Sequence, residues 1–128
     1  MILVDTAVWI DHFIETDPML QRLLDEGQVF SHPLVIGELA VGNLKPRDSI
    51  LKTLSFLPVI PAATDDEVLQ FIANRRLFGI GIGYIDAHLL AAVQLTPDAK
   101  LWTHDKRLHA AAGKLDLAIK PSARNTIH

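Results

Sequence analysis

The 128-residue sequence contains no cysteine, so the chain can form neither a disulfide bond nor a thiolate metal site. No stretch reaches the about 18 uncharged apolar residues that a membrane-spanning helix requires. The chain also does not begin with a basic stretch followed by a long apolar run, so we expect no signal peptide. Together these absences predict a soluble cytoplasmic protein.

An excess of positive charge is missing as well. The chain has 15 Asp and Glu residues against 12 Lys and Arg residues, which gives a formal net charge of −3. Proteins that bind nucleic acid through bulk electrostatics are usually basic, because their cations displace counterions from the phosphates. If this protein handles nucleic acid, we expect it to do so through a few local cations or through a bound metal ion.

Apolar residues are abundant for a chain of this length. They make up 49% of the sequence, and the mean hydropathy is +0.24. The length predicts one compact domain over residues 1–128. The core of such a small domain cannot contain every apolar side chain. We therefore expect apolar surface that is covered by a partner protein or by a second copy in a homodimer.

Very short apolar runs alternate with segments that carry helix signals. Such runs, separated by helices and lacking polar alternation, are typical of a parallel sheet covered on both faces. Ligands of these sheets bind at the carboxyl ends of the strands. The pattern predicts strands over 2–4, 29–30, 59–60, 101–103 and 117–119, and helices over 6–14, 18–26, 33–42, 46–57, 64–79, 84–95 and 106–112.

Four acidic residues lie in or at the end of apolar segments, whereas the other eleven lie among polar residues or at helix and strand boundaries. Asp5 ends the first apolar run, and Asp105 follows the apolar run at 101–103. Glu38 is the only charged residue between positions 33 and 44, and Asp86 is the only one between positions 77 and 97. A carboxylate in apolar surroundings is costly unless it is paired, protonated or bound to a metal.

Three explanations are open for these acids. Pairing with buried Lys or Arg is disfavoured, because the apolar segments contain none. The acids could be protonated, or they could converge on a divalent cation such as Mg²⁺ or Mn²⁺. Convergence is favoured because Asp5 and Asp105 each lie at the carboxyl end of a predicted strand. A purely structural role as helix caps stays open for both residues.

Four segments resemble the motifs of PIN-domain nucleases in order and spacing. They are LVDTAVWI at 3–10, VIGEL at 35–39, YIDAHLLAA at 84–92 and LWTHDKRL at 101–108. Each segment alone is a weak signal, but the four together are specific and cover nearly the whole chain. The bare domain is most similar to the VapC-type toxins of type II toxin–antitoxin systems.

This resemblance implies an α/β fold, a three-layer α/β/α sandwich around a short parallel sheet. It implies a metal-dependent endoribonuclease that hydrolyses phosphodiester bonds in RNA, with Mg²⁺ or Mn²⁺ as cofactor and a cognate antitoxin protein as partner. Asp5, Asp86 and Asp105 are then the expected metal ligands, and Glu38 is a further ligand or the acceptor of the proton from water. Thr6 and Thr103 are possible supporting residues, because their hydroxyl groups lie beside these acids in the sequence.

Two other readings stay open. A phosphoryl-transfer domain could use Asp5, although Thr6 and Ala7 follow it where the haloacid dehalogenases require a second Asp. A non-catalytic module could use the acids only to bind a metal or a partner protein. His88 and His104 lie next to the acids and are considered as ligands. Cations that could contact phosphate or a partner are Lys45, Arg47, Lys52, Arg75, Arg76, Lys106 and Arg107.

Overall fold

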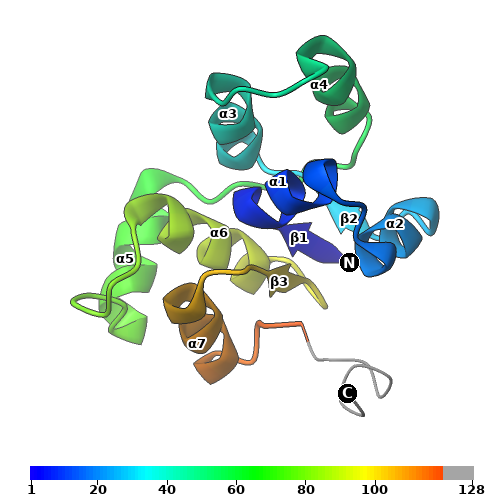
Figure 1. Ribbon diagram of the computed structural model, residues 1–128. Coiled ribbons are helices and arrows are strands. Elements are labelled where there is room, and N and C mark those ends of the chain that lie inside the picture. The colour runs from blue at the N-terminus through cyan, green and yellow to red at the C-terminus, as the bar shows by residue number, and fades with distance from the viewer. Residues whose placement is uncertain (120–128) are drawn as a thin grey trace.

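The computed structural model describes residues 1–119, and Figure 1 shows the arrangement of the helices and strands. In this part of the chain, no helix is long and apolar enough to cross a membrane. The elements follow one another in the order β1 (Ile2–Val4), α1 (Thr6–Ile14), α2 (Pro18–Asp25), β2 (Val29–Phe30), α3 (Pro33–Val41), α4 (Arg47–Ser55), α5 (Asp65–Arg75), α6 (Tyr84–Leu95), β3 (Lys100–Trp102) and α7 (Lys106–Lys114).

The three strands form one parallel sheet in the order β2-β1-β3. Helices connect the strands, as parallel pairing requires. The predicted strands at 59–60 and 117–119 are wrong as strands, because each is reduced to a single bridge within residues 1–119. Ser31 pairs with Val59 on one side of the sheet, and Leu101 pairs with Ala118 on the other.

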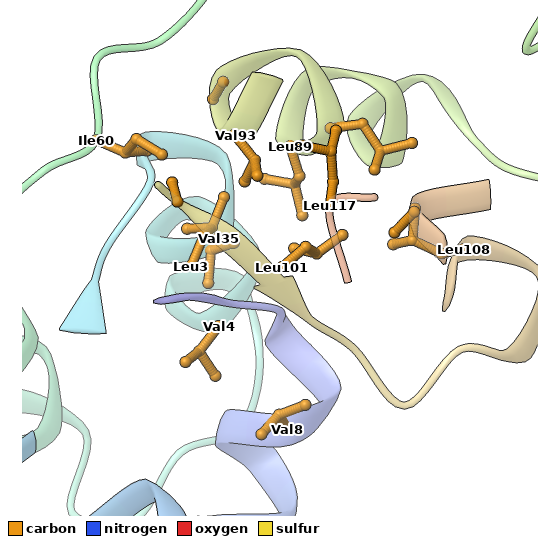
Figure 2. Close-up of a cluster of buried hydrophobic side chains, with 14 of the residues drawn as sticks. Leu3, Val4, Val8, Val35, Ile60, Leu89, Val93, Leu101, Leu108 and Leu117 are labelled. Atoms are coloured by element: carbon orange, nitrogen blue, oxygen red, sulfur yellow. The ribbon is translucent and has the colours of Figure 1, made fainter. Parts of the chain in front are cut away.

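Helices cover both faces of the sheet, because neighbouring residues on a strand point to opposite sides. Figure 2 shows Leu3 and Leu101 on the side of the sheet that faces Leu89 of α6. Val4 lies on the other side, near Val8 of α1. All five side chains are at most 1% exposed. The prediction of a sheet covered on both faces is therefore confirmed.

Local signals set most helix ends. Thr64 and Glu67 form both hydrogen bonds of a capping box at the start of α5. The prediction that this helix continues to about residue 79 is wrong, because α5 ends at Arg75 and Arg76 adopts the left-handed conformation with φ of 55°. Gly113 lies inside α7, which continues to Lys114 instead of ending at 112.

Candidate active site

Asp5 lies where β1 ends, and both of its carboxylate oxygens accept hydrogen bonds. Its Oδ1 accepts from the Thr6 N–H at 2.7 Å, and its Oδ2 accepts from the Thr103 hydroxyl at 2.7 Å. The Asp5 N–H donates to the Trp102 carbonyl at 2.9 Å, which extends the pairing of β1 with β3 by one residue. The side chain of Asp5 is therefore fixed at the carboxyl edge of the sheet.

Asp105 lies at the same edge, three residues beyond the end of β3. Its Oδ1 caps α7 by accepting a hydrogen bond from the Leu108 N–H at 2.9 Å. Its own N–H donates to Thr103 Oγ1 at 3.1 Å. The hydroxyl of Thr103 therefore contacts both strand-end acids. Asp5 and Asp105 are helix caps as well as neighbours, so the capping role and the shared site are not exclusive.

Glu38 and Asp86 come from helices. Glu38 of α3 accepts a hydrogen bond at Oε1 from the Thr6 hydroxyl at 2.8 Å, which ties it to the start of α1. Asp86, in the first turn of α6, accepts at Oδ2 from the Gly83 N–H at 3.0 Å. This bond turns the Asp86 carboxylate back toward the beginning of its own helix.

The charges of the four acids act on one another. The pKa of Asp86 is raised by burial and further by the negative charges of Asp5, Asp105 and Glu38, against the lowering effect of the Gly83 N–H bond. Within residues 1–119, the only Lys or Arg ion pair joins Arg47 to Asp48. None of these four acids is therefore ion-paired with a Lys or Arg within the described residues.

The expectation that all four acids lie in apolar surroundings is wrong for two of them. Asp5 is only 9% exposed and Asp86 is partly buried, but Glu38 and Asp105 are exposed. Glu38 shares the outer side of α3 with Val41, which is 89% exposed. The apolar sequence of α3 therefore does not mean that all sides of this helix are buried.

The donor set fits a hard divalent cation on chemical grounds. Four carboxylates repel one another without a countercharge, and carboxylate oxygens are preferred ligands of Mg²⁺ and Mn²⁺. Within residues 1–119, however, no three His, Asp or Glu side chains are arranged so that together they could hold an ion. Joint direct contact from three side chains is therefore not preformed here, although an ion that retains several waters, as Mg²⁺ does, would need only one or two carboxylates.

Sequence reasoning missed a buried histidine pair behind the acids. His32 is 1% exposed, and its Nδ1 accepts a hydrogen bond from the Leu34 N–H at 3.0 Å, which caps α3. The ring of His88 lies 6.5 Å from that of His32, between centroids. Burial, and then the charge of His88, lower the pKa of His32 to about 4. The only sequence signal for His32 is its place just before Pro33, the first residue of a helix.

His88 was considered as a metal ligand, but it contacts a different acid. Its Nε2 lies 3.0 Å from Oδ1 of Asp65, and the Tyr84 hydroxyl donates to the same oxygen at 2.7 Å. These contacts join α6 to the start of α5. His104 similarly contacts Asp11 of α1, with Nδ1 2.7 Å from Oδ2. Both histidines therefore link elements around the site.

The fold and the acidic edge of the sheet define a class of protein. The chain belongs to the PIN-domain family, whose model matches residues 2–114. Over 119 residues it is 49% identical to Ribonuclease VapC32 of Mycobacterium tuberculosis strain CDC 1551 / Oshkosh, and equally to that of strain ATCC 25618 / H37Rv. The match covers 93% of this chain and 96% of each relative. The resemblance drawn from the four sequence motifs is confirmed.

Proposed function

We propose that this protein is an endoribonuclease that hydrolyses phosphodiester bonds in RNA and acts as the toxin of a toxin–antitoxin pair. The carrying observation is near half identity, over almost the full length, to proteins named as VapC ribonucleases. The cluster of Asp5, Glu38, Asp86 and Asp105 supports the same conclusion. Each of the four motifs contributes one of these acids, and the charges of the other three act on Asp86.

In this proposal, Asp5, Asp86 and Asp105 bind Mg²⁺ or Mn²⁺ partly through water molecules that the ion retains, and Glu38 is either a further ligand or the acceptor of a proton from water. When bound, such an ion supplies positive charge for the phosphate oxygens and makes water more acidic. The chain keeps the carboxylates in place through hydroxyl groups, because Thr103 donates to Asp5 and Thr6 donates to Glu38.

The proposal explains how an acidic protein can accept RNA. The four carboxylates repel the phosphate that is to be cleaved until their charge is neutralised, so that one phosphate would enter the site together with the cation. Glu38 is the exposed member of the helical pair, which leaves its carboxylate accessible to water beside the bound phosphodiester. The products are two RNA fragments, formed when water adds to phosphorus and the P–O bond to the leaving nucleotide breaks.

The surface also supports protein partners, a cognate antitoxin and a second copy of the chain. Large apolar side chains are strongly exposed on several elements, among them Ile14 at 81%, Val41 at 89% and Phe56 at 77%. Covering such side chains with a partner removes apolar surface from water, which is favourable. We therefore propose a homodimer that binds its antitoxin through apolar surface.

The test is cleavage of a pool of cellular RNA by purified protein with Mg²⁺ or Mn²⁺, with and without EDTA. The key variant is Asp86→Asn, because asparagine can still accept the Gly83 hydrogen bond and so preserves the start of α6. Its matched control is Asp48→Asn, which removes an equal charge from a side chain that is 100% exposed.

We expect EDTA and Asp86→Asn each to lower the cleavage rate by about 100-fold or more, while Asp48→Asn cleaves like the wild type. Cleavage that survives in Asp86→Asn would mean that the site is misplaced. No cleavage by folded wild-type protein with metal present would favour the non-catalytic binding module instead.

A further inference from the structure

A groove of about 390 Å³ lies between the end of α5 and helix α7. Figure 1 shows these two elements on the same flank of the molecule. Four cationic side chains line the groove over an apolar floor that includes Leu77 and Leu115. The cations are Arg75, Arg76, Arg107 and Lys114.

The groove concentrates positive charge in a protein that is acidic overall. It holds four of the 12 Lys and Arg residues of the whole chain, and its lining contains no Asp or Glu. All four cations are exposed. Within residues 1–119, none of them forms an ion pair with a carboxylate. Four cations that repel one another along one groove are suited to an extended anion.

Helix geometry arranges two of these cations in a row. Arg107, Ala110, Ala111 and Lys114 all line the groove, and their spacing of three, four and seven residues places them on one face of α7. At a rise of 1.5 Å per residue, Arg107 and Lys114 lie about 10 Å apart along the axis. The small side chains between them leave that face open, and Arg75 and Arg76 complete the opposite wall.

Arg107 connects the groove to the acidic cluster. Arg107 follows Asp105 by two residues in the first turn of α7. Its side chain lies against the turn that precedes α6, because a Cβ atom on Gly81 would be only 2.6 Å from both Cδ and Nη1 of Arg107. That turn ends at Gly83, whose N–H binds Asp86. The absence of a side chain at Gly81 therefore leaves room for Arg107 against the turn that precedes Asp86.

We propose that this groove binds the sugar–phosphate backbone of the RNA next to the phosphodiester that is cleaved, with Arg107 nearest the acidic site and Lys114 farthest from it. This inference rests on the proposed ribonuclease function. Guanidinium groups bind phosphate oxygens in pairs, and a lysine provides a further point charge. RNA is favoured over an acidic protein segment because Arg107 follows Asp105 by two residues and lies against the turn before Asp86. In the proposed function, the phosphate that is attacked lies at these acids.

Arg76 offers a test that separates binding from stability. It occupies the left-handed position after α5, with φ of 55°. Glycine adopts this conformation without the steric penalty that an L side chain carries. Arg76→Gly should therefore preserve or raise the thermal stability while it removes one groove cation.

The experiment measures binding of a fluorescein-labelled, single-stranded oligoribonucleotide by fluorescence anisotropy, in EDTA so that the RNA stays intact, over a series of KCl concentrations. The variants are Arg76→Gly, Arg107→Gln and Lys114→Gln. The matched control is Arg22→Gln, which removes a cation from the exposed surface of α2, away from the groove.

We expect each groove variant to weaken binding several-fold and to lower the slope of log K against log salt by about 0.7 for each lost phosphate contact. Arg22→Gln should bind like the wild type. Groove variants that bind RNA with the wild-type affinity and slope would overturn the proposal. The proposal would also be overturned if they lost only the binding of the antitoxin, because the groove would then hold protein.

A second assay shows whether the groove proposal or the proposed ribonuclease function is the one that fails. Hydrolysis of bis(p-nitrophenyl) phosphate with Mn²⁺ needs the acidic site but no RNA backbone, so the wild type and Asp86→Asn are compared on it. One outcome is that the wild type hydrolyses this diester while Asp86→Asn does not, and that the groove variants still bind RNA with the wild-type affinity. In that case the groove proposal fails and the ribonuclease function stands. If the wild type hydrolyses neither this diester nor RNA, the function fails, whatever the anisotropy shows.

Discussion

The hydroxyl of Thr103 donates a 2.7 Å hydrogen bond to Oδ2 of Asp5, a residue 98 positions earlier in the chain. The same hydroxyl accepts the N–H of Asp105 at 3.1 Å. Thr103 is 7% exposed and Asp5 is 9% exposed, so water cannot readily replace this contact. One buried hydroxyl therefore sets the positions of both strand-end acids relative to each other.

Thr103→Val should impair both stability and cleavage. Valine has nearly the same shape, but it leaves the buried Asp5 oxygen without its donor and the Asp105 N–H without its acceptor. Loss of such a partner costs about 1–3 kcal/mol, and we expect the cleavage rate to fall at least about 10-fold because Asp5 is no longer held. Urea unfolding and RNA cleavage measure the two effects.

Thr103→Ser is the matched control, because it retains the hydroxyl and loses only a methyl group. It should retain most of the cleavage rate. If Thr103→Val cleaved RNA as fast as Thr103→Ser, the hydroxyl would have no positioning role at this site.

The sequence predicted the sheet better at its centre than at its margins. The run Ile2-Leu3-Val4 forms the central strand, and its burial on both faces explains why its apolar pattern was readable. The segments at 59–60 and 117–119 look equally apolar. Each forms only one bridge to its neighbour, at Val59 and Ala118. The number of residues that pair at a sheet edge depends on the path of the connecting loops through the fold. The local sequence does not determine that path.

For the site, the sequence could predict which acids lie at the ends of strands, but not what holds them. The contacts of Thr103 with Asp5 and of His88 with Asp65 join residues 98 and 23 positions apart. No local pattern marks such pairs. Likewise, Arg75 and Arg107 looked like separate surface residues, and only the packing of α5 near α7 brings them to one groove.

Asp86→Asn should stabilise the protein in the absence of metal. The Asp86 carboxylate is partly buried, and the charges of Asp5, Asp105 and Glu38 act against its ionised form, as its raised pKa indicates. Asparagine removes that repulsion and can still accept the Gly83 N–H. We therefore expect a melting temperature in EDTA at neutral pH that equals or exceeds that of the wild type.

Added Mg²⁺ or Mn²⁺ should reverse this order. Ligand binding stabilises the folded state in proportion to the logarithm of ligand concentration over Kd, and the wild type would bind the ion more tightly than Asp86→Asn. Differential scanning calorimetry with and without metal measures both differences. A wild type that gained no stability from either ion, or an Asn variant that gained as much, would contradict the assignment of Asp86 as a ligand.

His32 should make the folded protein less stable as the pH falls below neutrality. Its pKa is about 4 in the folded state, against 6.5 for an ordinary histidine, because burial and the nearby His88 disfavour its charged form. At a pH between these two pKa values, His32 is protonated in the unfolded chain but not in the folded protein. The contribution of His32 is thus complete above pH 6.5 and declines by up to about 3 kcal/mol as the pH falls to 4.

His32→Asn removes this titration and keeps the cap, because the asparagine side-chain oxygen can accept the Leu34 N–H that His32 Nδ1 accepts now. The variant is expected to be less stable at neutral pH, because a smaller side chain leaves a cavity. The decisive quantity is therefore the slope of the free energy of unfolding against pH, measured by urea unfolding between pH 6.5 and 4. His109→Asn, at an exposed position on α7, should keep the wild-type slope, whereas His32→Asn should flatten it. Parallel slopes for all three proteins would show that His32 does not carry this pH dependence.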